Sequence, residues 1–543
     1  MESSETRSRL LPATLMVVLS VSLLLVAGPT SVGAQALRSV HAAAGSTLTI
    51  AIPNDIETLD SDFSHYQMAN EVNYNTQDQY FIYGMKSTKY GYIQENVGQI
   101  RPKSTASWKL AKNGLSIVLN VQKGNRFCHT GNPVTAADYI YYFNRGIHTK
   151  SGYLFNIDGT HINGWKKLSK YSFKLTFSQH SPLFFEYFRD QSQAPVDMVE
   201  MQKHATKSDP WATVWKAKHD AGSGPYCVSR WLAGTEMDLT ANKYYKGPQK
   251  PHFKNIVLKV VPSSAERALL LKTGTVQIAE SLATDDINSL RGTPGVKILE
   301  IRSRNQYQIG LNNNMAPFNN RGVRQALSWA VPYQSIRANL FKGNALIPGG
   351  AIARTGSGFD AKSWPYTYNL AKAKSLLAKA GYPHGFSFTV DIASGDTVSQ
   401  DLAIIMQSTL SKIGVNMSIV TQTAANFAEG LDNKSDQAWL RGLLWYINDP
   451  GYVGTSLYAC GALENWMNYC NKQVDTLTNK ISNYWSPADH AKRVAAVNKW
   501  QTLINADAPT LNLAQPYFEV ATRSNISGYV SAPDEETLYN YLK

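Results

Sequence analysis

The chain has 543 residues, several times the size of a typical domain, so it has room for more than one hydrophobic core. Its 4 cysteines exclude a small disulfide-stapled scaffold, and 43% hydrophobic with 11% aromatic residues exclude a disordered chain. The formal net charge is +13, yet no run of four or more Lys or Arg occurs, so the basic residues form no patch of the kind that binds nucleic acid. We therefore expect a folded protein with no nucleic-acid partner.

Residues 1–36 have the pattern of a secretory signal peptide. Two arginines precede an apolar stretch over residues 13–27, and an Ala-x-Ala cleavage pattern ends at Ala36. The stretch is short for a membrane-spanning helix, and an uncleaved anchor is the alternative. No cysteine precedes Cys128, so we expect no lipid-modified N-terminal Cys. The sequence thus predicts an exported protein, located in the periplasm or at the outer face of the cell membrane.

Export makes the cysteines candidates for disulfide bonds, because extracytoplasmic compartments are oxidising. Cys460 and Cys470 lie close together in a stretch that contains Gly and Asn, and we predict a bond between them. Cys128 and Cys227 are the remaining pair. Each lies beside strand-like sequence, so these two either form a second bond or remain buried thiols.

Short strands and helices alternate along the chain. A helix is predicted after Thr135, its N-cap, with Asp138 three residues later and an apolar stripe beyond. Another begins after Asn369 and ends at Gly381. Strands are predicted where β-branched and aromatic residues alternate or cluster, at residues 48–52, 116–121, 172–177, 256–261 and 386–390. This alternation predicts an α/β protein.

A series of motifs, taken in chain order, resembles a single family. Residues 131–138 read Gly-Asn-Pro-Val-Thr-Ala-Ala-Asp and residues 222–226 read Gly-Ser-Gly-Pro-Tyr, both very like family signatures. Further matching motifs occur at residues 48–60, 106–108, 113–115, 123–124, 242–247, 266–279, 311–314, 317–318, 323–330, 369–381 and 413–415. On these motifs the chain is identified as a member of the extracytoplasmic solute-binding proteins of ABC importers, family 5, the class of oligopeptide, dipeptide and nickel binders. The resemblance covers nearly the whole mature chain.

The resemblance implies a two-lobed α/β fold of the periplasmic-binding-protein type II, in the large class that has an additional domain. Mapped onto this sequence, lobe I takes residues 45–79, 219–303 and 503–543, the additional domain residues 80–218, and lobe II residues 304–502. A ligand cleft lies between the lobes. The implied function is to bind a peptide-like or other small polar solute there and to deliver it, as a monomer, to ABC permease subunits with cytoplasmic ATPases.

Motifs for catalysis are missing from the sequence. It contains no zinc-binding His-Glu-x-x-His, nucleophile elbow, phosphate loop or dinucleotide turn. The adjacent acids at residues 285–286 and 535–536 are typical of solvated surface, since a glycosidase needs two carboxylates across a cleft. His129 follows Cys128, but no second ligand pair stands at zinc spacing. We expect a non-enzyme with no metal and no cofactor. The alternatives are a secreted hydrolase, a ligand sensor without transport and an extracytoplasmic chaperone.

Candidate ligand contacts fall in three segments. Two of them reach the cleft by the resemblance, and the predicted disulfide places the third at the edge of the cleft. The first precedes Pro450, where an aromatic pair can stack on a ligand while a carboxylate orients it. The second follows the Thr-Leu-Asp motif, and the third is the loop between the cysteines at 460 and 470. The candidates are Trp445, Tyr446 and Asp449 in the first segment, His65 and Tyr66 in the second, and Trp466 and Asn468 in the third. The alternative roles are core packing for the aromatic residues and a turn before Pro450 for the acid.

Tyr446 stands where relatives that hold a free peptide amino terminus have an Asp, three residues before the Asp of an Asp-Pro pair. A buried ammonium without a carboxylate partner costs several kcal/mol, and a neutral phenol does not replace that partner. We therefore expect ligands without a free α-ammonium at this subsite, such as an oligosaccharide, a blocked peptide or a chelate, unless Asp449 or Glu464 supplies the carboxylate.

Overall fold

The computed structural model describes residues 46–543, apart from residues 65–66, 152–156, 158, 190–193, 446, 485–488 and 533–534. The predicted signal peptide lies outside this part of the chain. Among the described residues, no helix has both the length and the hydropathy that a membrane crossing requires.

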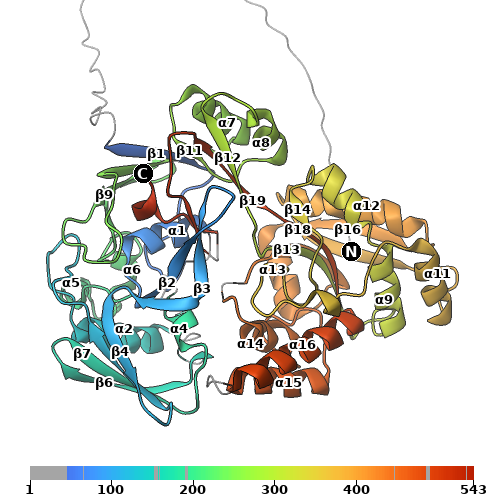
Figure 1. Cartoon of the computed structure of the whole chain (residues 1–543), viewed down its shortest axis with the longest axis horizontal. Coiled ribbons are helices and arrows are strands. Elements are labelled where there is room, and N and C mark those ends of the chain that lie inside the picture. Colours follow the sequence, from blue (N-terminus) through green and yellow to red (C-terminus); the bar gives the residue numbers. More distant parts are fainter. Residues whose placement is uncertain are drawn as a thin grey trace, which may run out of the picture. The chain divides into compact units, whose positions relative to one another are not determined.

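A seven-stranded sheet forms the centre of lobe I, in the order β12-β19-β11-β1-β10-β9-β8 (Figure 1). Its strands are β1 (Thr47–Ile52), β8 (Tyr226–Leu232), β9 (Glu236–Ala241), β10 (Asn255–Val260), β11 (Ile278–Ala279), β12 (Val296–Ile301) and β19 (Phe518–Arg523). β1 pairs in parallel with β10, placing Leu48 beside Ile256 and Ile50 beside Leu258. All four side chains are buried in one core, because alternate residues of a strand point to the same face of the sheet.

Helices α7 (Ser264–Thr273) and α8 (Thr284–Leu290) cover one face of this sheet over small residues such as Ala51. On the other face lie α1 (Gln67–Thr76) and the end of the chain, which includes the 3-10 turn Tyr539–Tyr541. Asn75 Nδ2 donates to the Thr537 carbonyl at 2.8 Å, and Asn75 Oδ1 accepts from the Tyr539 amide at 2.8 Å. These bonds attach the C-terminal segment to α1.

The glycines of the 222–226 motif pack against the end of α1. A Cβ atom on Gly222 would lie 2.2 Å from the Thr76 carbonyl oxygen, and one on Gly224 would lie 2.4 Å from the Thr76 carbonyl carbon. Only glycine fits at either position, so this family signature has a packing reason.

The additional domain contains a four-stranded antiparallel sheet, β4-β5-β7-β6. Its strands are β4 (Thr105–Leu110), β5 (Ser116–Val121), β6 (Ile162–Ser169) and β7 (Ser172–Phe177), and its helices are α2 (Ala136–Thr149), α4 (Phe184–Tyr187), α5 (Met198–His204) and α6 (Thr213–Lys216). The predicted start of α2 is confirmed, because Thr135 and Asp138 form a capping box. Tyr139, Tyr142 and Phe143 on α2 are fully buried. Beside this domain, β2 (Phe81–Ser87) and β3 (Ile93–Pro102) form a small sheet with β20 (Val530–Ser531).

Lobe II is built on a six-stranded sheet, β14-β18-β13-β17-β15-β16. Its strands are β13 (Gln306–Leu311), β14 (Ala345–Leu346), β15 (Ser387–Ala393), β16 (Asn416–Gln422), β17 (Ala438–Leu443) and β18 (Thr510–Pro516). Helices α9 (Arg321–Ala330), α11 (Leu370–Lys379) and α12 (Thr397–Ser411) share one core with this sheet. The predicted cap of α11 is confirmed, since Asn369 Oδ1 accepts from the Lys372 amide.

A second layer of lobe II contributes to a core cluster rich in aromatic residues, here named the aromatic cluster, which also includes the additional domain's core. This second layer of lobe II comprises α13 (Ala424–Asn433), α14 (Pro450–Val453), the π-helix Gly454–Tyr458, α15 (Lys472–Asn483) and α16 (His490–Asp507). The short elements α10 (Tyr333–Ser335), Ile336–Leu340 and Ala361–Ser363 complete the lobe.

The strand β18 pairs with β13 and β14 and therefore lies in the sheet of lobe II. The sequence-based mapping assigned residues from 503 onward to lobe I. Because backbone pairing with β13 holds residues 510–516 in the second sheet, the chain returns to lobe I only at β19. The two sheets are thus joined by two crossovers, after β12 and after β18.

The structure has the predicted disulfide bond in the short loop and also a bond between the pair that the sequence left open. Cys460 and Cys470 have their Cα atoms 4.5 Å apart, and Cys128 and Cys227 have theirs 5.7 Å apart. The second bond resolves the alternative of buried thiols, and it links the additional domain to β8 of lobe I.

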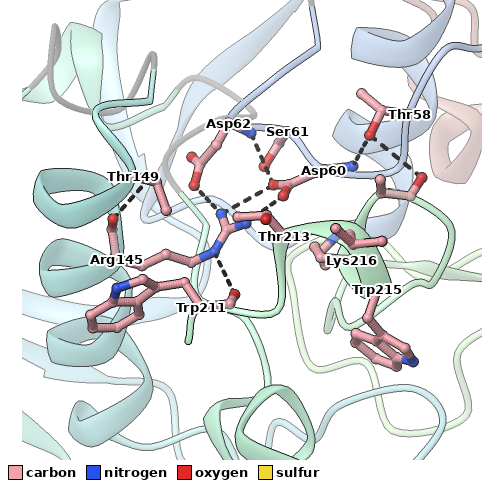
Figure 2. A network of polar contacts seen from close by, with 12 residues as sticks. Thr58, Asp60, Ser61, Asp62, Arg145, Thr149, Trp211, Thr213, Trp215 and Lys216 are labelled. Atoms are coloured by element: carbon pink, nitrogen blue, oxygen red, sulfur yellow. Dashed lines mark hydrogen bonds and ion pairs between the residues drawn. The ribbon is translucent and has the colours of Figure 1, made fainter. Parts of the chain in front are cut away.

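A buried charge network also joins the additional domain to lobe I (Figure 2). Arg145 on α2 forms ion pairs with Asp60 and Asp62, and Lys216 on α6 donates its ammonium to the Leu59 carbonyl. All four charged side chains are at most 3% exposed. Burial raises the pKa of Asp62 to about 7, an effect that the neighbouring Arg145 opposes. The loop after β1 is therefore held against α2 and α6.

Candidate functional site

The strand β17 turns one row of side chains toward the aromatic cluster and the other toward the core of lobe II. Ala438 and Leu440 belong to the lobe II core, whereas Trp439 and Leu443 belong to the aromatic cluster. This alternation follows from the two-residue period of a strand. β17 thus leads directly into the 444–449 segment and α14, which face the additional domain.

Aromatic contacts join the additional domain to lobe II at this point. The ring of Tyr187 on α4 meets the ring of Tyr452 on α14 edge to face, with centroids 6.0 Å apart. Trp445 packs edge to face on the same Tyr452 at 6.2 Å. A Cβ on Gly159 would lie 2.6 Å from the Tyr187 hydroxyl, so the glycine leaves room for this ring. We use the name interlobe cleft for the region around Tyr187, Tyr452 and Trp445, where the additional domain meets lobe II.

Asp449 is held within lobe II by a positive charge. Arg493 Nη2 donates to both of its carboxylate oxygens, at 2.7 and 2.8 Å. The same carboxylate accepts from the Gly451 amide at 2.7 Å and so caps α14. Its hydrogen-bonding capacity is largely used by these partners, so Asp449 is poorly placed to turn toward a ligand.

Two other acids at the cleft have raised pKa values. Burial raises the pKa of Glu186 on α4 to about 8, and Arg189 partly offsets this. Burial likewise raises the pKa of Glu464, in the 460–470 loop, to about 7, partly offset by Arg441. The Oε2 atom of each acid is buried and has no hydrogen-bond partner among the described residues. Both are therefore acids that a donor group on a ligand would satisfy.

These two acids make stability depend on pH. Their folded-state pKa values lie above the ordinary 4.5, so the unfolded chain loses its protons first as the pH rises. The folded state then loses stability between about pH 4.5 and pH 8. The double variant Glu186→Gln, Glu464→Gln is expected to exceed the wild type at pH 8 by on the order of 2 kcal/mol, and to match it near pH 4.5. Urea unfolding at both pH values measures this. Glu429→Gln, at an exposed position, is the control. The prediction is contradicted if the double variant differs from the wild type in free energy of unfolding by the same amount at both pH values.

The 460–470 loop is tied to the sheet of lobe II. Trp466 packs edge to face on Trp439 at 5.8 Å, and the Arg441 guanidinium lies 5.2 Å from the Trp466 ring centre. Asn468 has a left-handed backbone and donates to the Asn312 side chain at 3.1 Å. Both predicted residues thus have structural contacts that hold this loop beside β17 and β13.

A small polar cavity of about 40 Å³ lies where the crossovers meet both lobes. Glu95 and Glu535 line it from lobe I and the adjoining small sheet, Arg304 from the first crossover, and Thr355 and Asn448 from lobe II. Arg302, in the same crossover, lies between the rings of Tyr90 and Tyr517, at 4.5 and 5.0 Å from their centres. Charged and amide groups of both lobes therefore meet around one small cavity.

The family model for bacterial extracellular solute-binding proteins, family 5 (middle), matches residues 99–464. The chain belongs to this family. The resemblance drawn from the sequence motifs is thereby confirmed.

Relatives of this solute-binding protein cover most of its length. It is 26% identical to the probable D,D-dipeptide-binding periplasmic protein DdpA of Escherichia coli, over 68% of this chain and 71% of that protein. It is 23% identical to the heme-binding protein A of Haemophilus influenzae, over 80% and 82%. The solved structure of the periplasmic binding protein DppA of Helicobacter pylori, in complex with peptide STSA, superposes with a TM-score of 0.77 at 23% identity, covering 91% of this chain and 97% of that one. The predicted two-lobed fold is confirmed.

The structure brings some of the predicted site residues of this family 5 protein together. Trp445 and Asp449 both lie in the segment before α14, which Asp449 caps, and Trp466 and Asn468 lie in the disulfide loop beside β17. His65, Tyr66 and Tyr446 lie outside the described residues. Their roles as ligand contacts stay predictions.

Sequence reasoning did not name several groups at the cleft. Tyr452 could have been suspected, because it follows the Asp-Pro pair and is aromatic. Glu186 and Tyr187 gave no signal, since they lie in a short helix of the additional domain with no motif around it. Arg493 lies on a helix whose sequence carries no motif of this kind.

Proposed function

We propose that the chain is the extracytoplasmic solute-binding component of an ABC importer. It binds a peptide-like or other small polar solute in the interlobe cleft and delivers it, as a monomer, to a membrane permease. The family match is the observation that carries this proposal. Two relatives are named for binding a D,D-dipeptide and heme, and the ABC transporter-associated DppA of Helicobacter pylori was solved in complex with a peptide. These names support a small-solute ligand. The proposed role includes no chemical step.

Capture requires the lobes to separate. The cavity at the crossovers is about 40 Å³, whereas sites for small organic ligands usually hold about 300–1,000 Å³. A dipeptide enters only when Tyr187 and Tyr452 move apart. Ligand contacts made in the closed form alone then shift the population toward closure. The closed lobes present a composite face to the permease.

Cargo bound to the purified protein can be identified by mass spectrometry after denaturation. Adding that cargo at a hundred times its dissociation constant is expected to stabilise the protein by about 2.7 kcal/mol. Small-angle scattering should record compaction without product formation. Turnover of the cargo, or binding without compaction, would contradict the proposal.

The aromatic contact across the cleft is expected to contribute to closure. Tyr452→Ala should weaken cargo binding about two- to tenfold, since an aromatic pair contributes about 0.5–1.5 kcal/mol beyond its buried area. Calorimetry measures the loss. Tyr368→Ala, an exposed tyrosine of the same lobe, is the matched control and should bind as the wild type does. Equal affinities for all three proteins would argue against a cleft between α4 and α14.

We also propose that the cleft favours ligands without a free α-ammonium. Asp449 is engaged by Arg493 and the Gly451 amide, so it is not free to anchor an ammonium. Burial raises the pKa of Glu464 to about 7 and that of Glu186 to about 8, so neither acid offers a full negative charge near neutral pH. N-acetylation of a mixed peptide pool is expected to leave calorimetric affinity nearly unchanged. If acetylation abolishes binding, the proposal is wrong. In that case Glu464→Gln, compared with Tyr446→Asp, identifies which position receives the ammonium.

A further inference from the structure

A second, larger cavity lies away from the interlobe cleft, where the additional domain meets lobe I. Its volume is about 540 Å³, within the range of sites for small organic ligands. The loop around Phe127, the start of α5 and the end of α6 line it from the additional domain, and β8 lines it from lobe I. None of its lining residues contributes to the cleft described above.

The walls of this junction cavity are held in place before any ligand arrives. Trp215 is stacked between His204 and His219, with ring centres 4.2 and 4.7 Å apart and nearly parallel planes. Figure 2 shows the Trp215 ring turned away from the buried charge network. Trp231 donates its indole N–H to Asp55 at 3.0 Å. The disulfide of Cys128, which also lines the cavity, braces the loop against β8.

The acids of the cavity wall are already engaged. Asp197 caps α5 and accepts from the Asn132 side chain at 3.0 Å. Glu200 pairs with Lys203 at 2.7 Å and with His204 at 3.2 Å. These two carboxylates therefore leave little free negative charge for a ligand to meet.

The third acid, Asp220, accepts from the amides of Gly222 and Val228 and faces His129 at 3.4 Å. The hydrogen bond between His129 and Asp220 raises the pKa of the His129 ring, so the ring is cationic over a wider pH range. Lys218 lines the same space, and no ion pair or side-chain hydrogen bond of its ammonium occurs among the described residues. The uncommitted charge at this cavity is thus positive.

We propose that the junction cavity binds a small amphipathic carboxylate. Its apolar body lies against the walls formed by Phe127, Trp215 and Trp231, which exclude water from it. Its carboxylate pairs with Lys218, and His129 is a second lining residue that carries positive charge when protonated. Aromatic walls with a few placed polar groups are the usual composition of a small-ligand site. This site is separate from the cleft and does not depend on which solute is transported.

Phenylacetate is a suitable probe, with phenylacetamide as its neutral analogue. Binding measured by ligand-observed NMR is expected to be about three- to tenfold weaker for the amide than for the acid. Lys218→Ala should reduce the acid to the level of the amide. Lys207→Ala removes an exposed lysine that does not line the cavity, and it should leave both affinities unchanged.

Filling the cavity provides the stronger test. Ser229 is an exposed lining residue of β8, so Ser229→Trp places a large side chain in the cavity. This variant should abolish phenylacetate binding, while cargo binding and the melting temperature stay as in the wild type. Equal affinities for acid and amide, or no binding of phenylacetate to the wild type, would overturn the proposal. So would loss of phenylacetate binding in Tyr452→Ala but not in Ser229→Trp, since the probe would then occupy the cleft.

Discussion

Replacing Arg145 with Met is expected to destabilise the protein by about 3–5 kcal/mol, because it leaves buried carboxylates without their main cation. Arg145 is fully buried and is the residue that Asp60 and Asp62 share. Urea unfolding measures the loss. Lys216 remains nearby, but its ammonium is bound to the Leu59 carbonyl, so it replaces the guanidinium only in part.

The loss of stability should arise because the buried carboxylates of Asp60 and Asp62 lose their counter-charge, and not because the Met side chain has a different volume. Adding Asp60→Asn and Asp62→Asn to Arg145→Met is therefore expected to recover part of the stability. Arg126→Met changes an exposed arginine and should stay within about 0.5 kcal/mol of the wild type. A loss below about 1 kcal/mol for Arg145→Met, with no recovery in the triple variant, would show that the network does not hold the additional domain on lobe I.

The second large effect concerns the disulfide between Cys128 and Cys227. It closes a loop with a sequence separation of 99, compared with 10 for the bond between Cys460 and Cys470. The chain-entropy model gives about 4.7 kcal/mol for a loop of roughly 100 residues and about 3 kcal/mol for the short one. Replacing both cysteines of a pair with Ala should therefore cost more stability for the long loop, as measured by chemical unfolding under oxidising conditions.

For cargo binding the order of the two double variants should be reversed: the variant that loses less stability should lose more affinity. The short loop carries Trp466 and Glu464 beside the cleft, so Cys460→Ala with Cys470→Ala is expected to weaken cargo binding severalfold. Cys128→Ala with Cys227→Ala should leave cargo binding unchanged at a temperature where the protein remains folded. The same loss of stability in both variants would mean that loop length does not determine the contribution of these bonds.

The helix starts at Thr135 and Asn369 were predictable from sequence because a cap is a local bond between residues two or three apart. The strands at 48–52 and 172–177 were predictable because alternation along a strand is also local. The pairing of Cys460 with Cys470 followed from their closeness and an exported chain. Ordered motifs identified the family, and the structure gives one of them a packing reason, the close approach of Gly222 and Gly224 to Thr76.

By itself, then, the sequence determined the local elements, the family and the disulfide in the short loop. The tertiary structure alone decided which distant groups meet: Tyr187 with Tyr452, and Asp449 with Arg493, which lies 44 residues further along the chain. It also placed β18 in the second sheet, and it buried Glu186 and Glu464 enough to raise their pKa values. The physical reason is that burial and long-range charge pairing depend on all the elements that pack around a side chain, and no local pattern of residues encodes that environment.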